Sequence, residues 1–158
     1  MSPGDSMVLY RALPKSLRFS KCEKQELRSF ASELSSRIAD GRAFTCLVTD
    51  DRELRALNRE FLGHDYPTDV LSFPGGADGA SVGELAISVE RAAAQADEFG
   101  HDCTDEVRIL MLHGLLHLIG MDHERDRGEM ARAERKWRAE LSLPATLIAR
   151  NSVRSGAR

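Results

Sequence analysis

The chain contains the run His113-Gly-Leu-Leu-His117-Leu-Ile-Gly120-Met-Asp122-His123, which holds three of its five histidines. Histidines four residues apart stand on one face of a helix, with Cβ atoms about 5–6 Å apart, so both rings can reach one ion. Gly120 can adopt the left-handed conformation that ends a helix and turn the chain so that His123 approaches the same point. Three neutral imidazoles leave a fourth position open for water, which is typical of catalytic zinc. We therefore expect His113, His117 and His123 to bind one zinc ion per chain.

The predicted helix is apolar around its histidines, whether or not it binds a metal ion. Its apolar residues are Leu112, Leu115, Leu116, Leu118 and Ile119, so it should be buried. A single histidine on such a helix is most often a core residue with its hydrogen bonds satisfied. Three polar rings are costly there unless a ligand compensates for their burial, and the run therefore favours a metal site.

Length and composition predict one soluble domain over residues 1–158, with a flexible tail from about 145 to 158. No apolar run is long enough to span a bilayer, and the N-terminus lacks the features of a signal peptide, so we expect a cytoplasmic protein without membrane contact. The net charge of −3 gives no general argument for a nucleic-acid partner. The three cysteines, Cys22, Cys46 and Cys103, are widely spaced and indicate reduced thiols.

Hydrophobic periodicity predicts alternating strands and helices in the first half of the chain, then two strands and three helices. The expected strands cover 7–13, 42–49, 68–73 and 82–89, and the last two form a hairpin-like pair. The expected helices cover 20–39, 50–61, 90–99, a histidine helix from 104, and 127–141. Ser20 and Glu23 suggest a capping box. Thr104 is expected to cap the histidine helix, with Asp105 and Glu106 in its first turn.

Three further blocks carry a family resemblance: Leu57-Asn58, Pro67-Thr68-Asp69-Val70-Leu71-Ser72-Phe73 and Gly83-Glu84-Leu85-Ala86-Ile87-Ser88. With the histidine run, they resemble the YbeY family of bacterial rRNA maturation factors, in the right order over about residues 54–124. The resemblance implies an α+β fold, with a small mixed β-sheet of about four strands, about five helices and a metzincin-like histidine helix. It also implies a zinc-dependent, single-strand-specific endoribonuclease in 16S rRNA 3′-end maturation and ribosome quality control. Its implied partners are ribosomal RNA, ribosomal proteins and ribosome-associated GTPases.

One position departs from the family pattern. Many members have an aromatic–arginine pair shortly after Leu-Asn, where this chain has Phe61-Leu62. That arginine is the natural candidate for binding phosphate. Arg59 lies on the same predicted helix and is the candidate substitute for it. The alternative, at least as strong, is that Arg59 is an ordinary solvated surface residue. Thr68, Asp69 and Ser72 are candidates for a substrate groove beside the metal, but alternation alone would place them on the solvent face of any half-buried strand.

A zinc protease and a structural zinc protein are the competing interpretations. The metzincin pattern has a glutamate as its general base, where this chain has Gly114, so a protease built on this run would lack its proton acceptor. Asp122 is a candidate catalytic base or a partner that orients a ligand, or it only caps the turn. A ribosome-associated factor without enzymatic activity would use zinc only to hold the fold. His64 and His101 lie outside the motif and are predicted to be surface residues.

Overall fold

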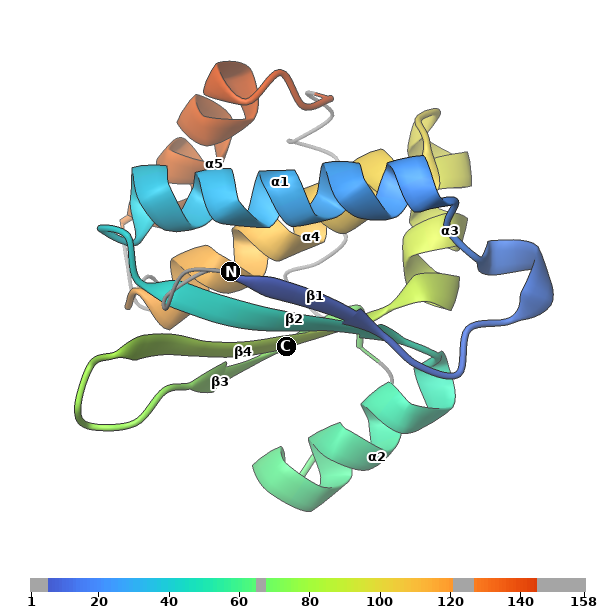
Figure 1. Cartoon of the computed structure of the whole chain (residues 1–158), viewed down its shortest axis with the longest axis horizontal. Coiled ribbons are helices and arrows are strands. Elements are labelled where there is room, and N and C mark those ends of the chain that lie inside the picture. The colour runs from blue at the N-terminus through green and yellow to red at the C-terminus, as the bar shows by residue number, and fades with distance from the viewer. Residues whose placement is uncertain (1–5, 65–67, 121–126, 145–158) are drawn as a thin grey trace.

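The chain forms a four-stranded mixed sheet in the computed structural model, which describes residues 6–64, 68–120 and 127–144 (Figure 1). The strands are β1 (Met7–Tyr10), β2 (Ala43–Thr49), β3 (Val70–Pro74) and β4 (Ser81–Ser88). Their order in the sheet is β1-β2-β4-β3. Strands β1, β2 and β4 are parallel, whereas β3 runs antiparallel to β4 at the sheet edge. The predicted hairpin-like pair and the mixed sheet are therefore confirmed.

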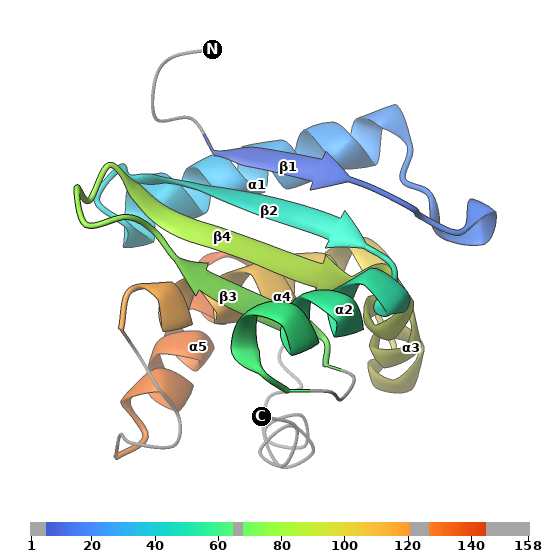
Figure 2. The ribbon, with the colours of Figure 1, turned by 90° about the horizontal axis from the view of Figure 1, so that it is seen from below.

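Helices cover the two faces of the sheet unequally. The helices are α1 (Lys21–Ile38), α2 (Asp51–Leu62), α3 (Val89–Phe99), α4 (Cys103–Leu118) and α5 (Glu129–Glu140), with a short 3₁₀ helix η1 (Lys15–Leu17). Figures 1 and 2 show α1, α3, α4 and α5 on one side of the sheet and α2 on the other. The five α-helices of the described residues match the predicted number, and α2 packs mainly against β3 and β4.

Helix α4 lies at the centre of the core. Its buried apolar residues are Val107, Ile109, Leu110, Met111, Leu112, Leu115 and Leu116. They pack in one cluster with Leu85 and Ile87 of β4 and with Leu34 of α1. Each leucine removed from water in this way contributes about 1.5–3 kcal/mol. The core therefore fixes α4 against the sheet and, with it, the place of its histidines.

Local signals set most of the predicted helix ends. The capping box is present, since the backbone N–H of Glu23 donates to Ser20 Oγ over 3.0 Å and that of Ser20 donates to Glu23 Oε1 over 2.8 Å. The prediction that Thr104 caps α4 is wrong. Asp102 is the N-cap and α4 begins at Cys103. The Thr104 hydroxyl instead donates to Glu23 Oε2 over 3.2 Å, because α1 begins beside the start of α4.

The first strand is shorter than predicted. It ends at Tyr10 rather than at residue 13, because Ala12 has φ of +58° and turns the chain out of the sheet. All three cysteines are free thiols, as expected. Within the described residues, no helix has both the length and the apolar character that a membrane span requires. The predicted tail at 145–158 lies outside those residues.

Candidate functional site

The last two turns of α4 place His113 and His117 on one helix face. Their ring centroids are 4.9 Å apart and their planes are inclined by 72°. The helix ends at Leu118, and Gly120 has φ of +103°, the left-handed conformation that was predicted at this helix end and that favours glycine. Asp122 and His123 lie outside the described residues. Within those residues, no group of three His, Cys, Asp or Glu side chains could hold a metal ion.

His113 contacts a carboxylate that the sequence did not point to. Its Nδ1 forms a short hydrogen bond with Oε1 of Glu134 in α5. Glu134 in turn lies near Arg138, with 3.6 Å between Oε2 and Nη2. The three side chains are only 2–3% exposed. Because Nδ1 is engaged, Nε2 is the nitrogen of His113 that can bind a metal ion. A histidine that binds a metal through one nitrogen commonly donates the other N–H to a carboxylate.

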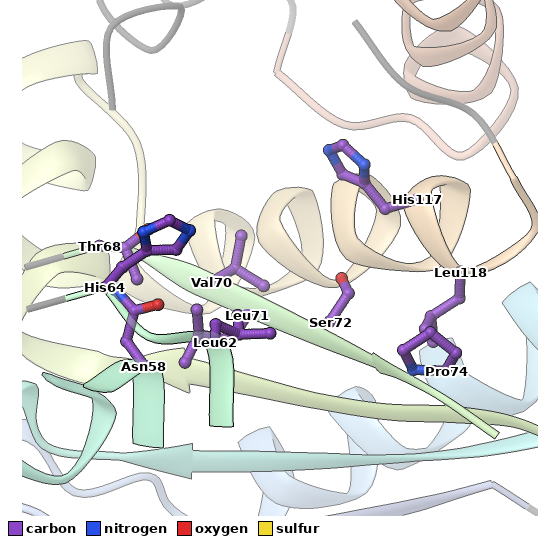
Figure 3. Close-up of a pocket in the computed structure, with 10 residues that line it drawn as sticks. All are labelled: Asn58, Leu62, His64, Thr68, Val70, Leu71, Ser72, Pro74, His117 and Leu118. Atoms are coloured by element: carbon purple, nitrogen blue, oxygen red, sulfur yellow. The ribbon is translucent and has the colours of Figure 1, made fainter. Parts of the chain in front are cut away.

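A pocket of about 340 Å³ lies beside His117, between the end of α2, strand β3 and the end of α4 (Figure 3). The residues that line it are Asn58, Leu62, His64, Thr68, Val70, Leu71, Ser72, Pro74, His117 and Leu118. Figure 3 shows His64 and His117 at different ends of this pocket. Two of the candidate substrate residues, Thr68 and Ser72, thus line this pocket, with Ser72 on the side of His117 and Thr68 beside His64 (Figure 3). The Ser72 hydroxyl donates to the carbonyl of Gly114 over 3.1 Å, which ties β3 to α4.

The other two candidate substrate residues lie elsewhere. The carboxylate of Asp69 accepts a hydrogen bond from Gln95 Nε2 of α3 over 3.4 Å. Arg59 is exposed in the last turn of α2, and neither residue lines the pocket. Leu62, at the position of the family's usual arginine, does line it, and so does His64 two residues later. His64 is exposed, as predicted. Its position in the wall of the pocket was not predicted.

The prediction that His101 is a surface residue is wrong. Its side chain is 7% exposed, and its Nε2 lies 2.7 Å from Oε1 of the fully buried Glu106. Gly100, with φ of +74°, ends α3 and returns the chain toward α4. His101 therefore belongs to the start of α4, at the opposite end of this helix from His113 and His117.

Gly114 is a packing residue between α4 and the sheet. A Cβ atom at this position would lie 2.7 Å from Cδ2 of Leu85 and 3.3 Å from Cγ2 of Val70. A glutamate, the base of the protease pattern, would therefore press into the sheet. Close packing of α4 on β4 thus explains why glycine stands next to His113, and it counts against the protease interpretation.

The fold and the site together form an α+β domain in which one histidine of the pair on α4, His117, lines a pocket of the size used for small ligands. A family model described as endoribonuclease YbeY matches residues 15–142. The chain therefore belongs to the endoribonuclease YbeY family, as its motifs indicated. Endoribonucleases cleave phosphodiester bonds inside an RNA chain, so membership gives the class of substrate and of reaction.

Individual relatives agree with this assignment. The chain is 54% identical to "Endoribonuclease YbeY" of Solibacter usitatus (strain Ellin6076) over 149 residues, which cover 94% of this chain and 97% of the relative. It is 53% identical to the protein of the same name from Koribacter versatilis (strain Ellin345) over 106 residues, or 67% and 69% of the two chains. The solution structure of TM1509 from Thermotoga maritima has a TM-score of 0.57 and 25% identity, covering 86% and 92% of the two chains.

Proposed function

We propose that this endoribonuclease holds one zinc ion with His113, His117 and His123 and cleaves single-stranded RNA, in the maturation of the 3′ end of 16S rRNA and in ribosome quality control. The observation that carries the proposal is the pair of rings 4.9 Å apart on α4, with the Nδ1 of His113 already engaged by Glu134. Two imidazoles on one helix face, one of them oriented by a carboxylate, suit zinc.

The described residues fit such an ion. His113 and His117 supply nitrogen ligands, and His123 follows the turn at Gly120, although it lies outside the described residues. When bound, zinc supplies Lewis-acid chemistry toward a phosphodiester oxygen. Asp122 stays a candidate for the base or for a partner that orients a ligand.

The pocket beside His117 supplies the surface that binds RNA. Its volume of about 340 Å³ is at the lower end of the range for small-ligand sites and suits one nucleotide. Leu62, Val70 and Leu118 offer apolar contact to a base, whereas Thr68 and Ser72 offer hydroxyl groups to the ribose and phosphate. A nucleotide within a duplex would have to unpair before it could enter, which costs a few kcal/mol. The pocket therefore favours a single strand.

The cellular setting rests on the family resemblance. Ribosomal RNA as the natural substrate, ribosomal proteins or ribosome-associated GTPases as partners, and a cytoplasmic location all belong to the same proposal. A synthetic RNA matching the 3′ region of 16S rRNA, single-stranded or annealed to its complement, is the direct substrate for testing it.

The experiment compares wild-type protein with His117→Ala, and uses His101→Ala as the matched control at the other end of α4. We expect wild type and His101→Ala to bind one zinc ion per chain and to cleave the single strand faster than the duplex. His117→Ala should stay folded by circular dichroism but lose zinc and cleavage. Equal cleavage by wild type and His117→Ala would reject the zinc nuclease, and hydrolysis of peptides but not of RNA would favour a protease instead.

A further inference from the structure

We infer that Glu134 is a positioning residue that orients His113 toward the metal ion, and that Arg138 holds Glu134 in place. The inference rests on the proposed zinc site and assigns it two residues of α5, a helix that holds none of the three predicted ligands. Helix α5 contacts α4 directly, and the three side chains form a chain of contacts from Arg138 through Glu134 to His113.

Burial is the first argument. Glu134 and Arg138 are each 2% exposed, and His113 is 3% exposed. Removing a carboxylate and a guanidinium from water costs several kcal/mol per ion, and apolar residues of similar volume are often as stable or more stable in such positions. Stability alone therefore gives a weak reason for these two charges. Their contact with a predicted metal ligand gives a specific one.

The choice of nitrogen is the second argument. Glu134 meets Nδ1 of His113, the ring nitrogen nearer the backbone. A carboxylate there accepts the Nδ1–H bond and so keeps the proton on Nδ1 and the lone pair on Nε2. It also limits rotation of the ring. Both effects prepare Nε2 to bind an ion, and loss of such a partner typically lowers metal affinity by about 10- to 100-fold.

The place of Arg138 is the third argument. Its Nη2 is 3.6 Å from Oε2 of Glu134, one turn along α5, so the two carboxylate oxygens have different neighbours. Arginine keeps its charge in proteins, and it therefore offsets the buried negative charge of Glu134. Oε1 is directed toward His113 while Oε2 is directed toward Arg138. This arrangement fixes the carboxylate as well as the imidazole.

The test measures zinc affinity by competition with a fluorescent chelator, together with the thermal stability of the metal-free protein. The variants are Glu134→Gln and the double variant Glu134→Leu/Arg138→Met, which replaces the charges by apolar groups of similar volume. Glu106→Gln is the matched control, since it alters the other buried His–Glu pair on α4. We expect the double variant to fold and to bind zinc about 10- to 100-fold more weakly. Glu134→Gln should show a smaller loss, and Glu106→Gln should bind as wild type does.

A second readout is the tautomer of His113, seen by nitrogen NMR of the metal-free protein. Wild type should show the proton on Nδ1, and Glu134→Gln should show a mixture of tautomers. Unchanged zinc affinity and an unchanged tautomer in Glu134→Gln would overturn the inference, even if the double variant failed to fold. Failure of the proposed function looks different, because wild type would then bind no stoichiometric zinc or His117→Ala would bind it equally well.

Discussion

Helix α4 has a buried histidine–glutamate pair at each end, and the two pairs differ in a way that locates the site. His101 and Glu106 lie five residues apart, and their side chains are 7% and 0% exposed. His113 and Glu134 join α4 to α5 across 21 residues and are 3% and 2% exposed. Burial and a carboxylate partner are thus common to both pairs and do not by themselves indicate a metal site.

The two pairs differ in which ring nitrogen of the histidine contacts the carboxylate. Glu106 meets Nε2 of His101, and the remaining Nδ1 is buried with no hydrogen-bond partner among the described residues. Glu134 meets Nδ1 of His113, so Nε2 is the ring nitrogen that this carboxylate does not contact, and the ring centroid of His117 lies 4.9 Å from that of His113. His117, which supplies that ring, also lines the pocket. Among the described residues, only the pair at the C-terminal end of α4 therefore has a second histidine and a pocket beside it, which is why the proposed metal site is placed there.

The largest expected effect is on catalysis when the metal is removed. Chelation should reduce RNA cleavage to the level of the buffer control while the thermal transition remains, because α1, α4 and the sheet share an apolar core. Cleavage assays and circular dichroism with and without a chelator, followed by zinc addition, make the measurement. Loss of the whole transition in metal-free protein would show that both ends of α4 depend on the metal and that its role is structural.

The next effect concerns stability at the other end of α4. His101→Ala removes a hydrogen bond to the buried carboxylate of Glu106 and should lower the free energy of unfolding by about 2 kcal/mol. Zinc affinity should not change, because the pair is remote from His117. Urea unfolding of metal-free protein and chelator competition give the two numbers. A variant that lost zinc but kept its stability would reverse the assignment of the two pairs.

A smaller effect is expected on RNA binding. Arg59→Ala on α2 should weaken binding about two- to threefold at low salt and reduce the salt dependence, because one phosphate contact is lost. Lys21→Ala, at the start of α1, is the control and should change neither. Fluorescence anisotropy with labelled single-stranded RNA at several salt concentrations gives both quantities. Equal affinities for wild type and Arg59→Ala would remove Arg59 from the binding surface.

The elements predicted best were those whose signal is local. The period of α1, its capping box and the spacing of His113 and His117 depend on residues within a few turns. The end of β1 did not follow from such a signal. Nothing in the β-prone run shows that Ala12 adopts a positive φ, a conformation that only the folded context imposes.

The supporting half of the site was missed for the same reason. Met130, Glu134 and Arg138 recur every four residues and form the buried side of α5. A glutamate and an arginine in such a stripe resemble ordinary solvent-facing charges, because their partners come from another helix. His101 was wrongly predicted to be a surface residue, because a histidine that follows Gly100 resembles a loop residue in the sequence. In the folded chain it is buried against Glu106 of α4. Spacing can predict candidate ligands on one helix, but not the residues of another helix that contact them.

The smallest predicted effect is on the pKa of Cys103. It tests whether the His101–Glu106 pair, at the start of α4, acts only on the residues around it. The pKa of Cys103 is raised to about 11, first by burial and then by the negative charges of Glu106, Glu23 and Asp97. Glu106→Gln removes one of these charges, so the pKa of Cys103 should fall slightly and alkylation should begin at a lower pH. Burial remains the larger cause and keeps the change small.

Alkylation by iodoacetamide as a function of pH, in a Cys22→Ser background, isolates this thiol. Cys46 does not interfere, because complete burial raises its pKa to about 12. Glu134→Gln is the matched control and should leave the Cys103 profile unchanged, since His113 lies ten residues further along α4. An equal shift in both variants would mean that the two pairs are electrostatically linked through the helix. A shift in Glu106→Gln alone, with unchanged zinc affinity, would show that this pair acts on its own surroundings and not on the metal.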